Sequence, residues 1–165
     1  EAIAAYDEAM EVTKAYVEKF ALDSDRQQYG ARLGEFGAYL AKYDPARALE
    51  IAKRSRELTP QATFPRAAEA YANFYEKNWQ AAYDILEKWS DQIADASANA
   101  AEFRVEMQLI MAISLANLDR SSDARNTMKL AEKGLEECDE KARDYLDDLV
   151  QEARRLTSDG GPDLE

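Results

Sequence analysis

Apolar side chains recur along this chain at alternating spacings of three and four residues. The first 22 residues show the pattern at Ile3, Tyr6, Met10, Thr13, Val17 and Phe20. Such spacing places apolar side chains on one face of an α-helix, because the helix turns once in about 3.6 residues. No segment combines period-two alternation of β-branched residues with flanking turn signals. The pattern therefore predicts an all-α fold without a sheet.

Capping residues and prolines divide the chain into eight expected helices. Asp44 and Pro45 combine an N-cap with a first-turn proline, so they end one helix and begin the next. Ser24 and Gln27 form a capping box. The eight expected starts lie at residues 1, 24, 44–45, 63–65, 78–79, 95–99, 119–122 and 139. The second helix is expected to reach about Tyr43, the third Leu58, the sixth Leu118 and the eighth about Leu156.

A short pattern of small and large residues recurs with spacings of three, four and three residues. Its copies are Pro45, Ala48, Ala52 and Ser55; then Trp79, Ala82, Leu86 and Trp89; then Ser121, Ala124, Met128 and Ala131. Tyr6, Ala9, Thr13 and Tyr16 place the first helix in the same series. The second copy begins 34 residues after the first, and the third begins 42 residues after the second. About eight residues are therefore inserted near 90–105.

A 34-residue period in helix pairs resembles the tetratricopeptide repeat. Leu33, Phe36, Gly37 and Leu40 match the family's aromatic or leucine, leucine, glycine and tyrosine series. The resemblance implies a right-handed stack of antiparallel helix pairs that forms one domain over residues 1–156. Its parts would be repeats at about 28–60, 63–93 and 97–136, an N-terminal half pair at 1–22 and a capping helix at 139–156. Residues 157–165 are expected to form a disordered tail that ends in a cloning remnant.

The resemblance also implies a partner-binding groove lined by the first helix of each pair. Its positions in this chain would be Gly34, Ala38, Lys42, Ala68, Ala72, Tyr75, Leu109 and Ile113. Most are small or apolar, and they lack the basic and amide set with which some family members clamp a terminal carboxylate. A helical or extended apolar segment of a partner protein would fit such a groove. The alternative is that the chain's own N-terminal helix fills it.

The net charge of the chain limits the classes of partner that it is expected to bind. The chain carries 33 acidic and 21 basic residues, a net charge of −12. Nucleic acids and anionic membrane surfaces are thereby disfavoured, because both need a concentrated basic face. A single cysteine, Cys138, allows no intrachain disulfide, and no apolar run approaches the roughly 18 residues of a membrane span. We expect a bacterial protein of the cytoplasm, or a soluble domain of a longer protein whose targeting segment is missing; self-association is left open.

The sequence gives little support for a catalytic site or a metal site. The chain has no histidine, which excludes Ser-His-Asp triads, histidine bases and the usual zinc sites. The acidic stretch 136–148 lacks the glycine-containing loop of a calcium site and is interpreted as solvated surface. The two acids beside Cys138 disfavour its thiolate, and Trp79 and Trp89 occupy packing places of the repeat. The sequence therefore predicts no catalytic residue, cofactor or metal.

The expected function is a non-catalytic protein-interaction module or scaffold. One alternative is a small acidic chaperone for a secreted partner. Another is a ligand-binding regulatory domain with a pocket near residues 90–105, for which only Glu102, Arg104 and Tyr75 offer polar groups. The segment 102–118 is apolar on nearly every side, which predicts burial or an oligomer contact. The last helix has one apolar stripe and an acidic back, as the end of a helical stack requires.

Overall fold

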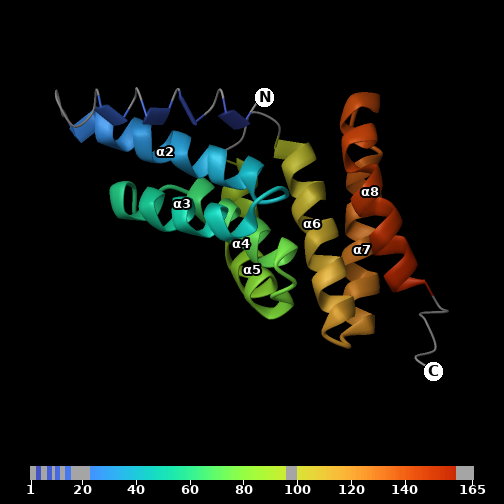
Figure 1. Ribbon diagram of the computed structural model, residues 1–165. Helices are drawn as coiled ribbons and strands as arrows, with labels where there is room; N and C mark the ends of the chain where they lie inside the picture. The colour runs from blue at the N-terminus through green and yellow to red at the C-terminus, as the bar shows by residue number, and fades with distance from the viewer. Residues whose placement is uncertain are drawn as a thin grey trace. The chain divides into compact units, whose positions relative to one another are not determined.

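The computed structural model describes residues 3–4, 7–8, 10–11, 14–15, 23–95 and 100–158. In these ranges it contains seven helices with assigned bounds and no strand, which confirms the predicted all-α class (Figure 1). The helices are α2 (Asp23–Leu40), α3 (Pro45–Leu58), α4 (Phe64–Tyr75), α5 (Trp79–Asp95), α6 (Ala100–Asn117), α7 (Ser121–Leu135) and α8 (Glu140–Thr157). The eight described residues between 3 and 15 are also helical.

The chain divides into two compact units, Glu1–Glu76 and Lys77–Glu165. The first unit contains α2, α3 and α4, and the second contains α5 to α8. The boundary between them falls after α4, inside the second expected repeat at 63–93. The single continuous stack over residues 1–156 stays a prediction.

In the first unit each of α2, α3 and α4 packs against the other two. Three glycines on one face of α2 allow this close packing. A Cβ atom on Gly30 would lie 2.6 Å from Cγ2 of Thr59, and one on Gly34 would lie 2.8 Å from the backbone nitrogen of Pro65. At Gly37 the distance to Cβ of Ala68 would be 3.0 Å. Side chains larger than hydrogen at these places would push α2 away from its neighbours.

Helix α6 lies at the centre of the second unit and packs against α5, α7 and α8. Its side chains are buried around most of the helix circumference, at Val105, Met107, Leu109, Ile110, Ala112, Ile113 and Leu115. A helix that is apolar on nearly every side needs neighbours on nearly every side. The predicted burial of the segment 102–118 is thus confirmed, and the oligomer contact remains untested.

Helix α8 has the predicted two-sided character. Its buried residues Ala142, Leu146, Val150 and Ala153 follow one stripe, and it packs against α6 and α7. The acidic residues Asp144, Asp147, Asp148 and Glu152 are exposed. Tyr145, next to this stripe on the helix, is not buried, because its side chain is 59% exposed. The Tyr145 hydroxyl donates a hydrogen bond to the buried Glu106 carboxylate at 3.0 Å.

Two of the predicted helix starts show the expected cap. The carboxylate of Asp44 accepts a hydrogen bond from the backbone N–H of Arg47 at 3.1 Å, with Pro45 in the first turn of α3. The carboxylate of Asp139 accepts one from the N–H of Ala142 at 2.8 Å and so caps α8. Each cap satisfies a backbone donor that the helix itself leaves free.

Three predicted boundaries need correction. Asp23 is already helical, so Ser24 lies inside α2 and is not its N-cap. Helix α2 ends at Leu40 and not near Tyr43, because the N–H of Tyr43 bonds three residues back to the Leu40 carbonyl and forms a turn. Thr157, assigned to the tail, is the last residue of α8. The rest of the 1–22 helix, the caps at 96–99 and the tail beyond 158 fall outside the described residues.

Two turns share an unusual backbone conformation. Lys77 has φ 62° and Asp119 has φ 59°, in the left-handed region that few side chains adopt. Each residue lies two positions before a helix start, at Trp79 and at Ser121. The two turns are 42 residues apart, which is the spacing between the second and third copies of the sequence pattern. The repeated sequence pattern is accompanied by a repeated turn.

Candidate binding groove

Five of the eight predicted groove residues are buried. Ala68, Ala72 and Leu109 have no exposed surface, and Ile113 is 1% exposed. Gly34 is also buried and lies against the first turn of α4, at Phe64 and Pro65. The small residues Gly34, Ala68 and Ala72 let the chain's own helices approach one another, and all five buried residues belong to the core. Their burial does not favour a groove open to a partner at these positions.

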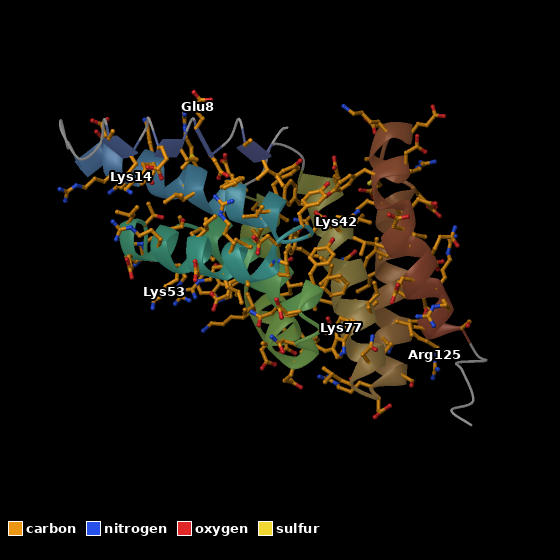
Figure 2. All side chains as sticks on the ribbon, viewed as in Figure 1. Glu8, Lys14, Lys42, Lys53, Lys77 and Arg125 are labelled. Atoms are coloured by element: carbon orange, nitrogen blue, oxygen red, sulfur yellow. The ribbon has the colours of Figure 1, made fainter. Side chains whose placement is uncertain are left out.

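The other three predicted groove residues retain surface. Ala38 and Tyr75 are partly buried, and the ring of Tyr75 packs edge-on against Phe74 at 5.1 Å. Lys42 is exposed in the turn that follows α2 (Figure 2). The structure brings only some of the eight predicted groove residues together. Ala68 of α4 packs against Gly37 of α2, in the first unit, whereas Leu109 and Ile113 belong to the second unit.

The described part of the N-terminal segment contacts α3. The guanidinium of Arg47 donates two hydrogen bonds to the Asp7 carboxylate, one of them at 3.1 Å. This hydrogen bonding is the largest cause of the raised Arg47 pKa. Met10 is buried, with 8% of its surface exposed. The segment is therefore held against its own chain at these positions, as the self-filling alternative requires.

A groove of about 660 Å³ lies between α3 and α4, at a place that the sequence did not indicate. It is lined by Leu49, Lys53, Arg56, Glu57, Pro60, Arg66 and Glu69. The α3 residues recur at spacings of three or four, so they share one helix face. Lys53 extends from α3 in Figure 2. Five of the seven lining residues are charged, and the remaining two supply apolar contacts.

Ion pairs organise the charges of this groove. Arg56 on α3 donates to Glu69 on α4 at 2.8 Å and thus links the two walls. Arg54 donates to Glu57 at 2.9 Å on the exposed side of α3. Both acidic lining residues therefore already have an arginine partner. The side chains of Arg56 and Glu57 are 41% and 51% exposed, so the groove is open to solvent.

The groove lies in a locally basic part of an acidic chain. Residues 45–69 contain five basic and three acidic side chains, a net charge of +2, whereas the whole chain carries −12. The sequence signal that would have found this region is the run Lys53, Arg54, Ser55, Arg56. It was missed because the family resemblance directs attention to the first helix of each expected pair, and residues 45–58 were expected to form a second helix.

The pocket expected near residues 90–105 is small in the part that the structure describes. A hollow of about 200 Å³ between α6 and α7 is lined by Ala101, Arg104, Val105, Gln108, Leu130, Lys133, Gly134 and Glu137. Arg104 already pairs with Asp95 at 2.9 Å. Small-molecule sites usually occupy about 300–1,000 Å³. The geometry of this hollow therefore does not favour a regulatory ligand site.

Outside the groove, Tyr83 and Cys138 have raised pKa values that their surroundings explain. The Tyr83 hydroxyl donates to Glu87, and this hydrogen bond, with burial, raises the pKa of Tyr83. Arg120 lies 4.8 Å above the Tyr83 ring. Burial is the largest cause of the raised pKa of the Cys138 thiol, which confirms the expected direction. Neither group is poised to act as a base or nucleophile at neutral pH.

Trp79 and Trp89 are less enclosed than predicted. Both side chains are partly buried, so neither lies fully inside the core. The ammonium of Lys88 lies 5.7 Å from the centre of the Trp89 ring, within the range of a cation–π contact. Their partial burial is consistent with a packing role for both rings.

Among the described residues, no three or more Cys, Asp or Glu side chains are placed to hold a metal ion together. Within the same residues, no helix has both the length and the apolar character needed to cross a bilayer. Comparison with models of protein families, with curated proteins and with solved structures finds no match.

Proposed function

We propose that this chain is a non-catalytic protein-interaction module of tetratricopeptide-like helix pairs, and that it binds a partner segment between α3 and α4. The observation that carries the proposal is the open groove of about 660 Å³, whose walls are long charged side chains from two helices. The shared turns at Lys77 and Asp119 support the repeat architecture. Because most of the predicted groove residues on the first helix of each pair are buried, we assign the binding site to the face between α3 and α4 instead.

The side chains of the groove suit binding better than catalysis. Lysine and arginine supply positive charge and several N–H donors, and among the described residues no histidine, cysteine or serine lines the groove. The two acids, Glu57 and Glu69, are each held by an arginine, at 2.9 and 2.8 Å. Such a set recognises a charged or polar chain by hydrogen bonds.

The openness of the groove favours a polypeptide over a small molecule. Small-molecule sites typically bury about 70–90% of their ligand and are lined mainly by apolar side chains. Of the lining residues that the structure describes, only Leu49 and Pro60 are apolar, and Pro60 is itself exposed. An extended segment can lie along such a groove with one side in water, and can gain contacts over several residues.

Selection of displayed random peptides on the immobilised chain tests this function. We expect a set of related sequences that bind the wild type and are lost on Leu49→Trp, because the larger ring fills the groove. Leu130→Trp is the matched control, since Leu130 is 58% exposed on α7 of the second unit and is not among the lining residues of the groove. Circular dichroism must show both variants folded. Selection of no sequence above background, or equal binding to both variants, would contradict the proposal.

A further inference from the structure

Resting on the proposed function, we infer that the α3–α4 groove recognises an acidic segment of a partner protein, with carboxylates that alternate with apolar residues. Three features of the groove support this ligand: its surplus of positive charge, the free N–H donors of Arg56, and the apolar residues Leu49 and Pro60.

The groove carries a surplus of positive charge. Four basic side chains, Lys53, Arg54, Arg56 and Arg66, line or border it against two acidic ones, Glu57 and Glu69. Lys53 makes no ion pair with any residue that the structure describes. Charges are screened over about 8–10 Å at physiological salt. The negative charge elsewhere on the chain therefore does not cancel the attraction that a ligand meets inside the groove.

Arg56 shows that the groove already accommodates a carboxylate. Its Nη1 donates to Glu69 at 2.8 Å, across the space between α3 and α4. A guanidinium has five N–H donors, so a ligand carboxylate can bond to Arg56 while the Glu69 pair stays intact. Lys53, one turn before Arg56 on the same helix face, offers a second cation. Two carboxylates of an extended segment would thus meet two separate donors.

The apolar lining residues determine what stands between the carboxylates. Leu49 and Pro60 both line the groove. Apolar side chains of the ligand would lose water against them, whereas an uninterrupted run of carboxylates would leave them uncovered. A nucleic acid fits less well, because its phosphates need a long basic face and the chain as a whole carries −12.

Fluorescence anisotropy with a labelled hexapeptide in which three glutamates alternate with three leucines tests the inference. We expect binding that weakens as salt is raised from low to physiological concentration. Lys53→Glu is expected to weaken it about fivefold, which corresponds to about 1 kcal/mol for one surface charge. Lys53→Gln should produce a smaller loss in the same direction. Lys129→Glu, an equal charge change at an exposed site on α7, is expected to change binding less than about twofold.

Two control ligands test whether the groove recognises the carboxylates of the peptide. The same hexapeptide with glutamine for glutamate should bind at least about fivefold more weakly, because it keeps the leucines and loses the charge. Equal affinity for the glutamine peptide, or for a single-stranded oligonucleotide, would overturn the inference. So would equal losses from Lys53→Glu and Lys129→Glu, or no binding of the acidic peptide.

The outcomes separate this inference from the proposed function. Neutral or basic peptides that are selected on the wild type and lost on Leu49→Trp would sustain the groove as a binding site and refute its acidic ligand. Failure to select any groove-dependent peptide would refute both. Selection of peptides rich in aspartate and glutamate, with loss on Lys53→Glu, would support both.

Discussion

The buried hydroxyl of Ser55 on α3 donates a hydrogen bond to the backbone carbonyl oxygen of Gly30 on α2. The bond ties the last turn of one helix to a glycine of the other, at the place where a Cβ atom would clash with Thr59. We expect Ser55→Ala to lower the free energy of unfolding by about 1 kcal/mol, because one buried hydrogen bond is lost. Denaturant unfolding followed by circular dichroism measures this change.

Ser24→Ala is the control for that measurement and tests a corrected helix boundary. Ser24 is exposed within α2, so its loss should change the free energy of unfolding by less than about 0.5 kcal/mol. A capping serine would cost about 1 kcal/mol on substitution by alanine. A loss of that size at Ser24 would mean that α2 begins where the sequence pattern predicted.

Gly34→Ala is expected to destabilise the first unit. In an exposed helix the same change stabilises by about 1 kcal/mol, because alanine favours the helix. Here the added Cβ would lie 2.8 Å from the nitrogen and 3.0 Å from Cδ of Pro65, and these ring and backbone atoms cannot rotate away. We expect a loss of about 1–3 kcal/mol in thermal or denaturant unfolding. A raised melting temperature would show that Gly34 is not enclosed by the start of α4.

Gly134 of α7 and Val105 of α6 form a matched pair in the second unit. A Cβ on Gly134 would lie 2.5 Å from Cγ2 of Val105. Gly134→Ala should therefore overpack the contact, and Val105→Ala should leave a cavity, each at a cost of about 1–3 kcal/mol. In the double variant the new methyl group occupies the space that Val105 vacates. Unfolding of all four proteins should give a coupling energy of about 1 kcal/mol, whereas additive losses would exclude this contact.

The fold class and several helix starts could be predicted because their signals are local. Asp44 and Asp139 lie next to the backbone donors that they cap, so three or four residues of sequence contain the whole interaction. The all-round apolar character of 102–118 likewise predicted a buried helix without knowledge of its neighbours. The end of α2 was misplaced by three residues, since the apolar pattern continues to Tyr43 through a turn that keeps Ala41 buried.

The binding groove could not be predicted in the same way. Gly34 and Ala68 have the small side chains that suit an open groove and a tight helix contact equally well, and periodicity does not distinguish the two. Arg56 and Glu69 are 13 residues apart on different helices, and only the packing of α3 against α4 brings them within 2.8 Å. Spacing along the sequence therefore indicates which residues share a helix face, but not which neighbour that face contacts.

Cys138 provides a test of the second unit by its reactivity. The thiol is 7% exposed, and its pKa is raised first by burial and then by the nearby Glu102 carboxylate. Because the thiolate is the reacting form, iodoacetamide should modify the folded chain more slowly than the unfolded chain at every pH. The midpoint of its rate–pH profile should lie above the value of about 8.5 for a free thiol.

The same shift of the Cys138 pKa gives a pH dependence of stability whose sign is fixed. The unfolded chain loses the thiol proton first as pH rises, so it binds fewer protons than the folded chain between the two pKa values. The free energy of unfolding should therefore fall as pH rises from the free-thiol value through the folded one. Cys138→Ser removes this contribution, so the difference in stability between wild type and variant should shrink over that window.

Glu102→Gln should lower the alkylation midpoint of Cys138, because one source of its raised pKa is gone. Equal alkylation rates in the folded and unfolded chains would show that Cys138 is open to solvent, and the predicted loss of stability would then be absent.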